Sequence, residues 1–448
     1  MRDVSTATDR QGDLAPDDRA VYRAVVASAL GNCIEWFDFG VFTAGVMTSV
    51  IGTVFFPSDQ GGAATLRSFA LIAAAFVIRP FGGLFFGPLG DRIGRQKVLA
   101  MTIILMSGST FMIGVLPDYN AIGVAAPLLL LLVRLLQGFS TGGEYGGAAT
   151  VIAEYAPTRR RGFLGAFLEF GTLWGYVLGA SAVLLVDLLS SEPAMYAWAW
   201  RIPFWFALPL GLLGLYIRLR LQDTPAFREL TSAGRISRSP LREAISQHWH
   251  MILNLIGIVF LLNVADYSLL TFMPSYLSDN LGLSSVASSL TTIGVELGMI
   301  AVIAPLGRLS DRVGRRPLLL TAAIGYVILS WPAVRLMQVH DTAAVVLGFA
   351  IMGGLLVLIL AVIGSTFPAM FPTKVRYGAF AIGYNISTSL FGGTAAVVIG
   401  SLIEMTGSNF IPAYYLIIAG AVALVPILLI PETAGVPIDK VAVQPVPT

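Results

Sequence analysis

The segment EWFDFGVF, residues 35–42, places two carboxylic acids, Glu35 and Asp38, in a stretch that is otherwise almost wholly apolar. Residues three apart lie on the same side of a helix, so both acids can face one cavity. Glu35 would lie about 21 Å along a helix from Val21, near the middle of a bilayer. A carboxyl group at that depth can carry a proton, because burial favours the acid and a nearby arginine favours the anion. A structural pair that neighbouring helices satisfy is the alternative.

A second polar stripe lies in the segment RLLQGFSTGGEYGGA. Four polar residues recur there at i, i+3, i+7 and i+10, the spacing of one helix face: Arg134, Gln137, Thr141 and Glu144. Gly138, Gly142 and Gly146 form a GxxxGxxxG ridge on the adjacent face, which lets another helix approach closely. We expect the ridge to pack and the stripe, in which Glu144 is a further proton-coupling candidate, to face a cavity. An arginine bound only to backbone carbonyls is the alternative.

Further ionisable residues reach membrane depth elsewhere. Arg79, in VIRPFGG, lies about 18 Å from Asp91 along a helix, where it could bind a substrate carboxylate or form a structural salt bridge. Asp266 and Glu296 reach a similar depth, and we expect each to be structural or to take part in coupling rather than to touch substrate. Of these two, Asp266 joins the proton-coupling candidates. Glu169 lies nearer the end of its segment, and we expect it to be structural.

Aromatic side chains accompany these charges. Trp36, Phe39 and Phe42 flank the two acids, and other apolar segments contribute Trp174, Tyr176, Tyr267 and Tyr384. A quaternary ammonium group over aromatic faces gains roughly 2 kcal/mol when desolvated, so a zwitterion could bind its ammonium there and its carboxylate on an arginine. Packing is the alternative for any single ring. The predicted substrate-binding residues are Arg79, Arg134, Trp36, Phe39, Phe42, Trp174, Tyr267, Tyr384 and Asn385.

The composition indicates which solvent surrounds these residues. Of 448 residues, 56% are hydrophobic and only 12% are charged, against about 25% charged in an average soluble domain. Most of the chain must therefore be solvated by lipid. A net charge of +2 gives no reason to expect nucleic acid, and the single Cys33 excludes an intramolecular disulfide. The first twenty residues contain no apolar stretch, so we do not expect a signal peptide there.

Apolar runs between polar breaks predict an all-α membrane protein with twelve spans. Their approximate limits are 21–55, 66–89, 97–116, 121–154, 162–190, 201–220, 250–277, 285–309, 317–338, 342–371, 376–404 and 410–430. One set of loops holds 18 Lys or Arg residues and the opposite set holds only Arg67, Arg201 and Arg335. The positive-inside rule then places the basic loops and both termini in the cytoplasm. We expect cytoplasmic tails at 1–20 and 431–448 and a cytoplasmic linker at 221–249.

The two halves, 21–220 and 250–430, repeat a loop motif. GPLGDRIGR at 87–95 and GRLSDRVGR at 307–315 share G-x-L-x-D-R-x-G-R. Such a repeat indicates two six-helix bundles related by a pseudo-two-fold axis, with one binding site between them. The charged residues of the two motifs could clasp the halves as a cytoplasmic gate, or they could only fix the topology. They are Asp91, Arg92, Arg95, Asp311, Arg312 and Arg315.

The doubled motif in a 6+6 architecture resembles the major facilitator superfamily. The segments GNCIEWFDFG, RLLQGFSTGGEYGGA, AEYAPTRRRG and PAMFPTKVRYGAFAIGYNIS are similar to its metabolite:proton symporter branch, and most similar to bacterial proline/glycine-betaine osmoprotectant transporters. The resemblance implies alternating access in a bacterial inner membrane, and it implies a coupling role for Arg134. Two features differ from that subgroup: Asp266 stands where an uncharged residue is expected, and no heptad repeat follows the last span.

The sequence therefore predicts a proton-coupled symporter for a small zwitterion such as proline or glycine betaine. A symporter of an organic acid such as 2-oxoglutarate, citrate or shikimate is the main alternative, and a channel is a further one. The sequence has no phosphate-binding loop and no HExxH motif, so we expect no enzymatic activity, no cofactor and no metal. The expected partners are the substrate, the proton and the lipid bilayer, with no nucleic acid, and we expect the monomer to be functional.

Overall fold

The computed structural model describes residues 18–56, 62–93, 95–219, 240–339, 341–372 and 375–441. Within these ranges all regular structure is helical. The N-terminal half contains α1 (Asp18–Thr43), α2 (Gly45–Phe55), α3 (Gly62–Val77), α4 (Arg79–Ile93), α5 (Arg95–Ile113), α6 (Tyr119–Ile122), α7 (Ala125–Thr141), α8 (Tyr145–Tyr155), η1 (Thr158–Arg160), α9 (Arg161–Leu189), α10 (Glu192–Ala197), η2 (Ala199–Arg201), α11 (Ile202–Trp205) and α12 (Ala207–Leu219).

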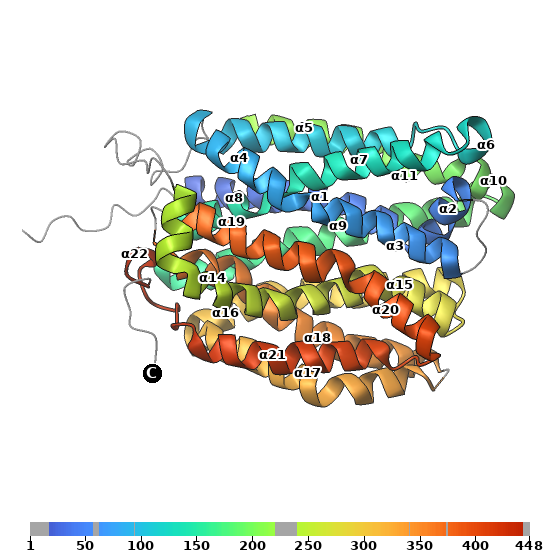
Figure 1. Ribbon diagram of the computed structural model, residues 1–448. Helices are drawn as coiled ribbons and strands as arrows, with labels where there is room; N and C mark the ends of the chain where they lie inside the picture. Colours follow the sequence, from blue (N-terminus) through green and yellow to red (C-terminus); the bar gives the residue numbers. More distant parts are fainter. Residues whose placement is uncertain are drawn as a thin grey trace, which may run out of the picture.

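The C-terminal half is built in the same way and includes three π-helical segments, η3, η4 and η6. It contains α14 (Pro240–Asp266), η3 (Tyr267–Phe272), α15 (Met273–Ser275), η4 (Tyr276–Asn280), α16 (Ser285–Val313), α17 (Arg315–Met337), α18 (Thr342–Thr366), η5 (Pro368–Met370), α19 (Arg376–Ser387), η6 (Thr388–Gly392), α20 (Gly393–Thr406), α21 (Ile411–Leu429) and α22 (Ile438–Val441). Figure 1 shows the N-terminal half, blue to green, beside the C-terminal half, yellow to red.

The twelve predicted spans each have a helical counterpart. Eleven helical segments of the described residues are long and apolar enough to cross a membrane. The shorter apolar helix Lys97–Ile113 corresponds to the predicted third span. Several spans consist of two helices joined at a break, such as α3 and α4, which meet at Ile78. The predicted twelve-helix class is confirmed.

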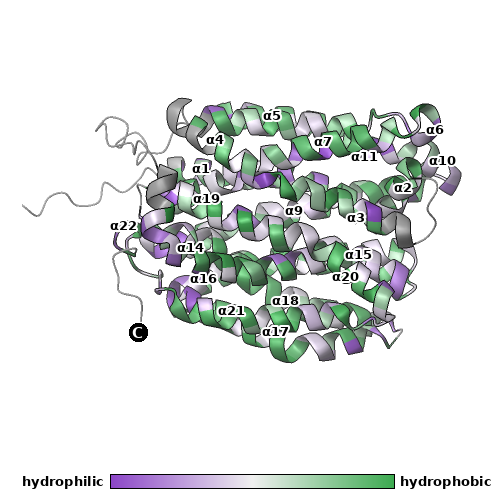
Figure 2. Ribbon diagram, in the orientation of Figure 1, coloured by the Kyte–Doolittle hydropathy of each residue, from purple (hydrophilic) through white to green (hydrophobic). Residues whose placement is uncertain are grey.

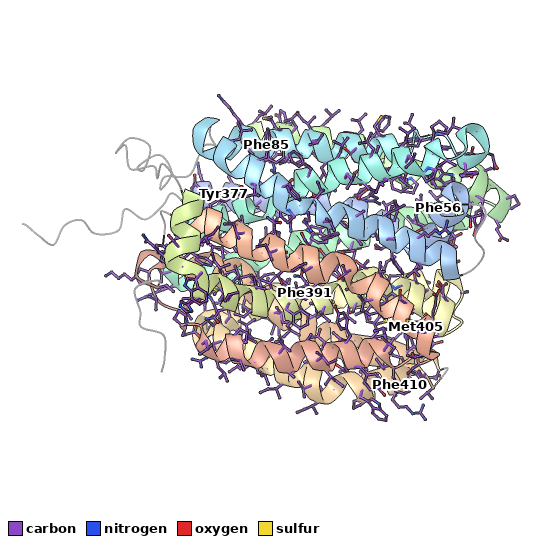
Figure 3. All side chains as sticks on the ribbon, viewed as in Figure 1. Phe56, Phe85, Tyr377, Phe391, Met405 and Phe410 are labelled. Carbon is purple, nitrogen blue, oxygen red and sulfur yellow. The ribbon has the colours of Figure 1, made fainter. Side chains whose placement is uncertain are left out.

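The outer surface of the bundle is apolar. Figure 2 shows hydrophobic residues along most of the helices, with hydrophilic residues at the two ends of the bundle and at some positions in its middle. Side chains such as Phe85 and Met405 project outward (Figure 3), and they are 54% and 81% exposed. Because an exposed apolar surface of this extent requires lipid as its solvent, the chain is a membrane protein.

The glycine ridge of the fourth span packs against the second span, as predicted. A Cβ atom on Gly138 would lie 1.8 Å from the carbonyl oxygen of Ala75, and one on Gly142 would lie 2.0 Å from that of Arg79. A Cβ on Gly146 would only touch Ala381 of α19, at 3.4 Å. Only glycine permits the first two approaches, which bring α7 against the α3–α4 break and set the position of Arg79.

The predicted tails and linker are described only in part. Residues 1–17, 220–239 and 442–448 lie outside the described residues. Within the predicted linker 221–249, α14 already begins at Pro240, so its last ten residues are helical. The chain after the last span also forms structure, since α22 lies within the predicted tail 431–448.

Candidate functional site

Each acid of α1 forms an ion pair with an arginine of a different helix. Arg79 Nη2 lies 3.4 Å from Glu35 Oε1, and Arg134 Nη1 lies 2.6 Å from Asp38 Oδ2. All four side chains are about 1% exposed. Removing either member of such a pair leaves a buried charge uncompensated, which typically costs about 3–5 kcal/mol. The two pairs thus link α1 to both the second and the fourth span.

Arg134 is held by more than its carboxylate. Its Nη1 also donates to Gln137 Oε1 at 2.9 Å, and Gln137 Nε2 donates to Thr110 Oγ1 at 2.8 Å. The guanidinium lies over the ring of Phe42, 3.6 Å from its centroid. Arg134 and Gln137 therefore act as neighbours on one face, as their spacing predicts, and Phe42 packs on the arginine rather than lining a substrate site.

The remaining coupling candidates have separate environments. Glu144 forms an ion pair with Arg218 of α12, which also donates to Leu99 O at 3.0 Å. Asp266 is the last residue of α14, buried at 5% exposure and within electrostatic range of Arg79. Glu169 accepts a hydrogen bond from Tyr145 OH at 2.5 Å, which is consistent with the structural role expected for it.

Five aromatic rings meet where the two halves face each other: Trp36, Phe39, Phe76, Tyr176 and Tyr267. The centroid of Trp36 lies 4.9 Å from that of Phe39, 5.4 Å from that of Tyr176 and 6.1 Å from that of Tyr267. The ring of Phe76 completes the group, 5.0 Å from Tyr267. We call these five residues the ring cluster. Tyr267 belongs to the C-terminal half and the other four to the N-terminal half.

Polar atoms without partners surround the ring cluster. Arg79 stands 4.6 Å from the centroid of Phe76. Within the described residues, Arg79 Nε and Nη1, Glu35 Oε2 and Trp36 Nε1 are buried without a hydrogen-bond partner, and Tyr267 OH lies close to the Arg79 guanidinium. Buried polar atoms are rarely left unmatched. The site therefore offers donors, one carboxylate oxygen and aromatic faces to a small ligand that carries both charges.

Three predicted substrate-binding residues lie elsewhere. The ring centroid of Trp174 lies 6.3 Å from that of Phe170 on the same helix, and Trp174 is only partly buried. Residues two apart on a helix point in different directions, so Trp174 does not face the ring cluster as Tyr176 does. Tyr384 stacks on Tyr145 across the halves at 4.2 Å. Asn385 Nδ2 donates to Gly142 O at 3.0 Å. Trp174 is therefore removed from the proposed substrate contacts, whereas Tyr384 and Asn385 join the two halves.

Phe76 is the ring that the sequence analysis missed. It lies in an apolar run with no polar neighbour except Arg79, and its spacing resembles that of any packed phenylalanine. Its position three residues before Arg79 was the signal that could have identified it.

Comparison with known proteins identifies the family. The family of sugar (and other) transporters matches residues 24–239 and 228–444. The chain belongs to this family. The transporter is 44% identical to the glycine betaine/proline/ectoine/pipecolic acid transporter OusA of Dickeya dadantii (strain 3937), with 94% of this chain and 85% of the relative covered. It is 42% identical to the proline/betaine transporter of Escherichia coli (strain K12), with 94% and 86% covered.

A solved structure shares the fold. The proton:xylose symporter XylE, of the major facilitator superfamily, bound to 6-bromo-6-deoxy-D-glucose, superposes with a TM-score of 0.77 over 95% of this chain and 99% of that chain. The identity is 17%, so this likeness establishes the fold alone. The protein is a membrane transporter of the major facilitator superfamily and not an enzyme.

The transporter's two halves are fastened at the end that carries Arg159, Arg160, Arg308 and Arg316, which we call the basic end. Asp311 accepts hydrogen bonds from the backbone N–H groups of Gly162 and Phe163, at 2.7 and 2.9 Å, at the beginning of α9. A carboxylate at a helix N-terminus is stabilised by the helix dipole as well as by these bonds. Arg376 pairs with Glu154 of α8 at 3.1 Å.

The chain after the last span supports this fastening. Gly314, between α16 and α17, has a φ of 100°, a conformation that favours glycine. The open space beside it lets Glu432 accept from the N–H groups of Arg315 and Arg316 at 3.0 and 3.1 Å. Arg315 in turn lies 3.3 Å from Asp311. The second motif is thereby held rigid against the N-terminal half.

The predicted gate residues divide into three groups. Asp311 and Arg315 lie at the contact between the halves. Arg312 is exposed and does not insert between them, so its predicted gate contact is not present in this conformation. The side chains of Asp91, Arg92 and Arg95 lie outside the described residues.

The halves also touch at the end opposite the basic end. Ser285 Oγ donates to Asp187 Oδ2 at 3.0 Å there, and beside the ring cluster Ser389 Oγ donates to Phe76 O at 2.6 Å. The rings of Phe69 and Phe272 are 5.8 Å apart. Contacts at both ends are those of an occluded conformation, in which the ring cluster is shielded from both sides.

Proposed function

We propose that the transporter is a proton-coupled symporter that takes up a small zwitterionic osmolyte, such as proline or glycine betaine, by alternating access. The single observation that carries this proposal is the ring cluster beside the Arg79–Glu35 pair, with its unmatched donors and acceptor. The names of the relatives, which are proline, betaine and ectoine transporters, support the same substrate class.

The binding mode follows from the unmatched atoms. The substrate carboxylate would accept from Arg79 Nη1 and from Trp36 Nε1. Its ammonium would lie over the faces of Trp36, Tyr176 and Tyr267. Desolvated contacts of this kind are worth roughly 2 kcal/mol each for a quaternary ammonium.

Coupling would use the carboxylates that the arginines hold. A substrate carboxylate on Arg79 competes with Glu35 for the same cation, so Glu35 is released and can take a proton. Asp38 with Arg134 and Glu144 with Arg218 form two further pairs that can open when the halves move. Asp266 of the C-terminal half lies within electrostatic range of Arg79 and would respond to the same change of charge.

The membrane orientation is part of the proposal. The positive-inside rule favours a cytoplasmic basic end in a bacterial inner membrane, with both termini on that side. We propose that Asp311 and Arg315 form the cytoplasmic gate there. The bundle has one site between its halves, and we propose that the monomer is the transporting unit.

An organic acid remains the second candidate substrate. A di- or tricarboxylate would need both Arg79 and Arg134, yet Arg134 is bound by Asp38 and Gln137 and covered by Phe42. It would also gain little from the ring cluster. The contacts of Arg134 therefore favour the zwitterion. A channel is disfavoured by the contacts that close both ends.

Uptake into proteoliposomes tests the substrate and the coupling together. Labelled proline uptake should saturate, should require an inward proton gradient, and should be inhibited by unlabelled betaine but not by 2-oxoglutarate. Inhibition by 2-oxoglutarate alone would refute the osmolyte. Ion conductance that does not depend on the proton gradient would refute the symporter.

A further inference from the structure

Glu296 lies in a small cavity between the halves that shares one wall residue, Tyr176, with the ring cluster. The cavity has a volume of about 10 Å³, close to the lower limit for one water molecule. Helices α1 and α9 and residues 270–296 of the C-terminal half enclose it. Its lining residues are Gly40, Thr43, Ala44, Tyr176, Ala180, Leu270, Pro274, Ser289, Thr292 and Glu296.

Glu296 is buried in this cavity without a charged partner. It is 1% exposed, and its Oε2 has no hydrogen-bond partner among the described residues. Thr43 Oγ1 donates to Phe39 O at 2.8 Å, and Thr292 Oγ1 to Ser288 O at 2.9 Å. With their hydrogens committed, these two hydroxyls can only accept. The remaining hydroxyls of the lining, on Tyr176 and Ser289, are neutral, so they do not compensate an ionised carboxylate, whereas a protonated Glu296 can donate to an accepting hydroxyl.

No cation faces Glu296 from the described elements around it. On α9, Tyr176 lines the cavity, and Asp187 is bound to Ser285 at the far end. On α1, Asp38 is bound to Arg134. Asp266 of α14 lies within electrostatic range and carries the same charge as Glu296. Helices α2, α15 and α18 carry no titratable side chain, and the charges of η1, η4 and α17 lie toward the ends of the bundle.

The cavity lies just inside the contacts that close the end opposite the basic end. Glu296 is about 16 Å along α16 from Ser285, at a rise of about 1.5 Å per residue. One wall of the cavity belongs to the N-terminal half and the other to the C-terminal half. Separating the halves at this end therefore exposes Glu296 to the medium. Closing them buries its charge without a partner, which is strongly unfavourable.

We propose that Glu296 is a proton-binding site, distinct from Glu35 and Asp38, whose neutralisation permits this end of the transporter to close. The inference rests on the proposed proton-coupled uptake and adds a place where the proton is loaded. The open form binds the proton, and only the protonated form closes. Closure therefore depends on the proton concentration outside, and a symporter needs this linkage.

A cysteine reporter measures closure directly. In a Cys33→Ser background, Ser285→Cys places a thiol at the contact between the halves, and an impermeant maleimide labels it when that end is open. Because maleimide reacts with the thiolate, each rate is divided by that of the exposed Met405→Cys at the same pH. With Glu296 intact, this ratio should fall as the external pH falls, by up to about tenfold per pH unit for one bound proton. Glu296→Gln should give a low ratio at every pH. Glu404→Gln, an exposed glutamate of α20, is the matched control and should behave as the parent.

The transport assay separates this inference from the proposed function. Glu296→Gln should retain substrate exchange, which also shows that it is folded, and should lose the pH dependence of the uptake KM. If the parent ignores the proton gradient, the proposed symport is wrong. If the parent responds and Glu296→Gln responds equally, only the Glu296 assignment is wrong.

Two further measurements keep the test decisive. If closure follows the Na⁺ concentration at fixed pH, the cavity binds Na⁺ and the proton assignment is overturned. If Glu296→Gln cannot be recovered folded, the isosteric Thr292→Val removes one acceptor of the same cavity. It should move the pH of half-maximal labelling, and an unchanged midpoint would overturn the proposal.

Discussion

Replacing Asp311 by asparagine should weaken the closed basic end. The carboxylate accepts from two N–H groups of α9 across the interface. Hydrogen bonds to a charged acceptor are worth about 1.5–3 kcal/mol each, and the helix N-terminus adds about 0.3–1 kcal/mol. Asparagine keeps one acceptor oxygen and loses the charge, so about 2–3 kcal/mol should be lost.

This loss acts on the equilibrium between closed and open forms of the basic end. Each change of about 1.4 kcal/mol alters an equilibrium constant tenfold, so the ratio of the open to the closed population should rise about 30- to 150-fold. Spin labels at Arg159 and Arg308, exposed residues in opposite halves, report the separation of the halves by pulsed electron resonance. The parent should give one short distance, and Asp311→Asn should add a longer population.

A matched control separates this interface effect from a general effect of losing a helix cap. Asp341 accepts from the N–H of Ala344 at 3.0 Å and caps α18 within one half. Asp341→Asn should leave the distance between the labels unchanged. The reasoning is refuted if Asp311→Asn leaves the distance distribution as in the parent, or if Asp341→Asn shifts it equally.

Other predictions concern the site and its packing. Glu35→Gln and Asp38→Asn should each abolish accumulation driven by a proton gradient while sparing exchange, measured in proteoliposomes; accumulation that survives both changes contradicts the coupling role. Trp36→Leu should raise the betaine Kd about 30-fold, from a loss of roughly 2 kcal/mol, with a smaller rise for proline; equal changes for both ligands would argue for general damage. Gly138→Ala should lower the thermal unfolding temperature by several degrees, since its Cβ would meet backbone at 1.8 Å, whereas Gly294→Ala has open space and should not.

Much of the fold was accessible from the sequence because lipid imposes strong constraints. A span must be apolar over about 20 residues, so its position in the chain can be predicted from local composition alone. The repeated loop motif marked the two halves, and the GxxxGxxxG spacing marked the face of the fourth span that packs. The sequence did not indicate that the polar residues after Pro240 form a helix that extends beyond the apolar span.

The site was accessible only in part, because helical periodicity fixes depth and face but not partner. The sequence placed Glu35, Asp38, Arg79 and Arg134 at similar depth, yet several pairings satisfied that condition. Only the packing of α1 against the second and fourth spans decided that Arg134 binds Asp38 and that Arg79 binds Glu35. Likewise, Trp174 and Tyr176 have equal claims in the sequence, and only the rotation of α9 about its axis brings Tyr176 to Trp36.

The sequence by itself determined that the chain crosses a membrane in two repeated halves and carries charges too costly to be there without a purpose. Only the tertiary structure decided which charges neutralise one another, that Asp311 binds the beginning of α9, and that Glu296 is left without a partner. The reason is physical. Composition and spacing act within one helix, whereas the match of a donor to an acceptor depends on how separate helices are packed and rotated.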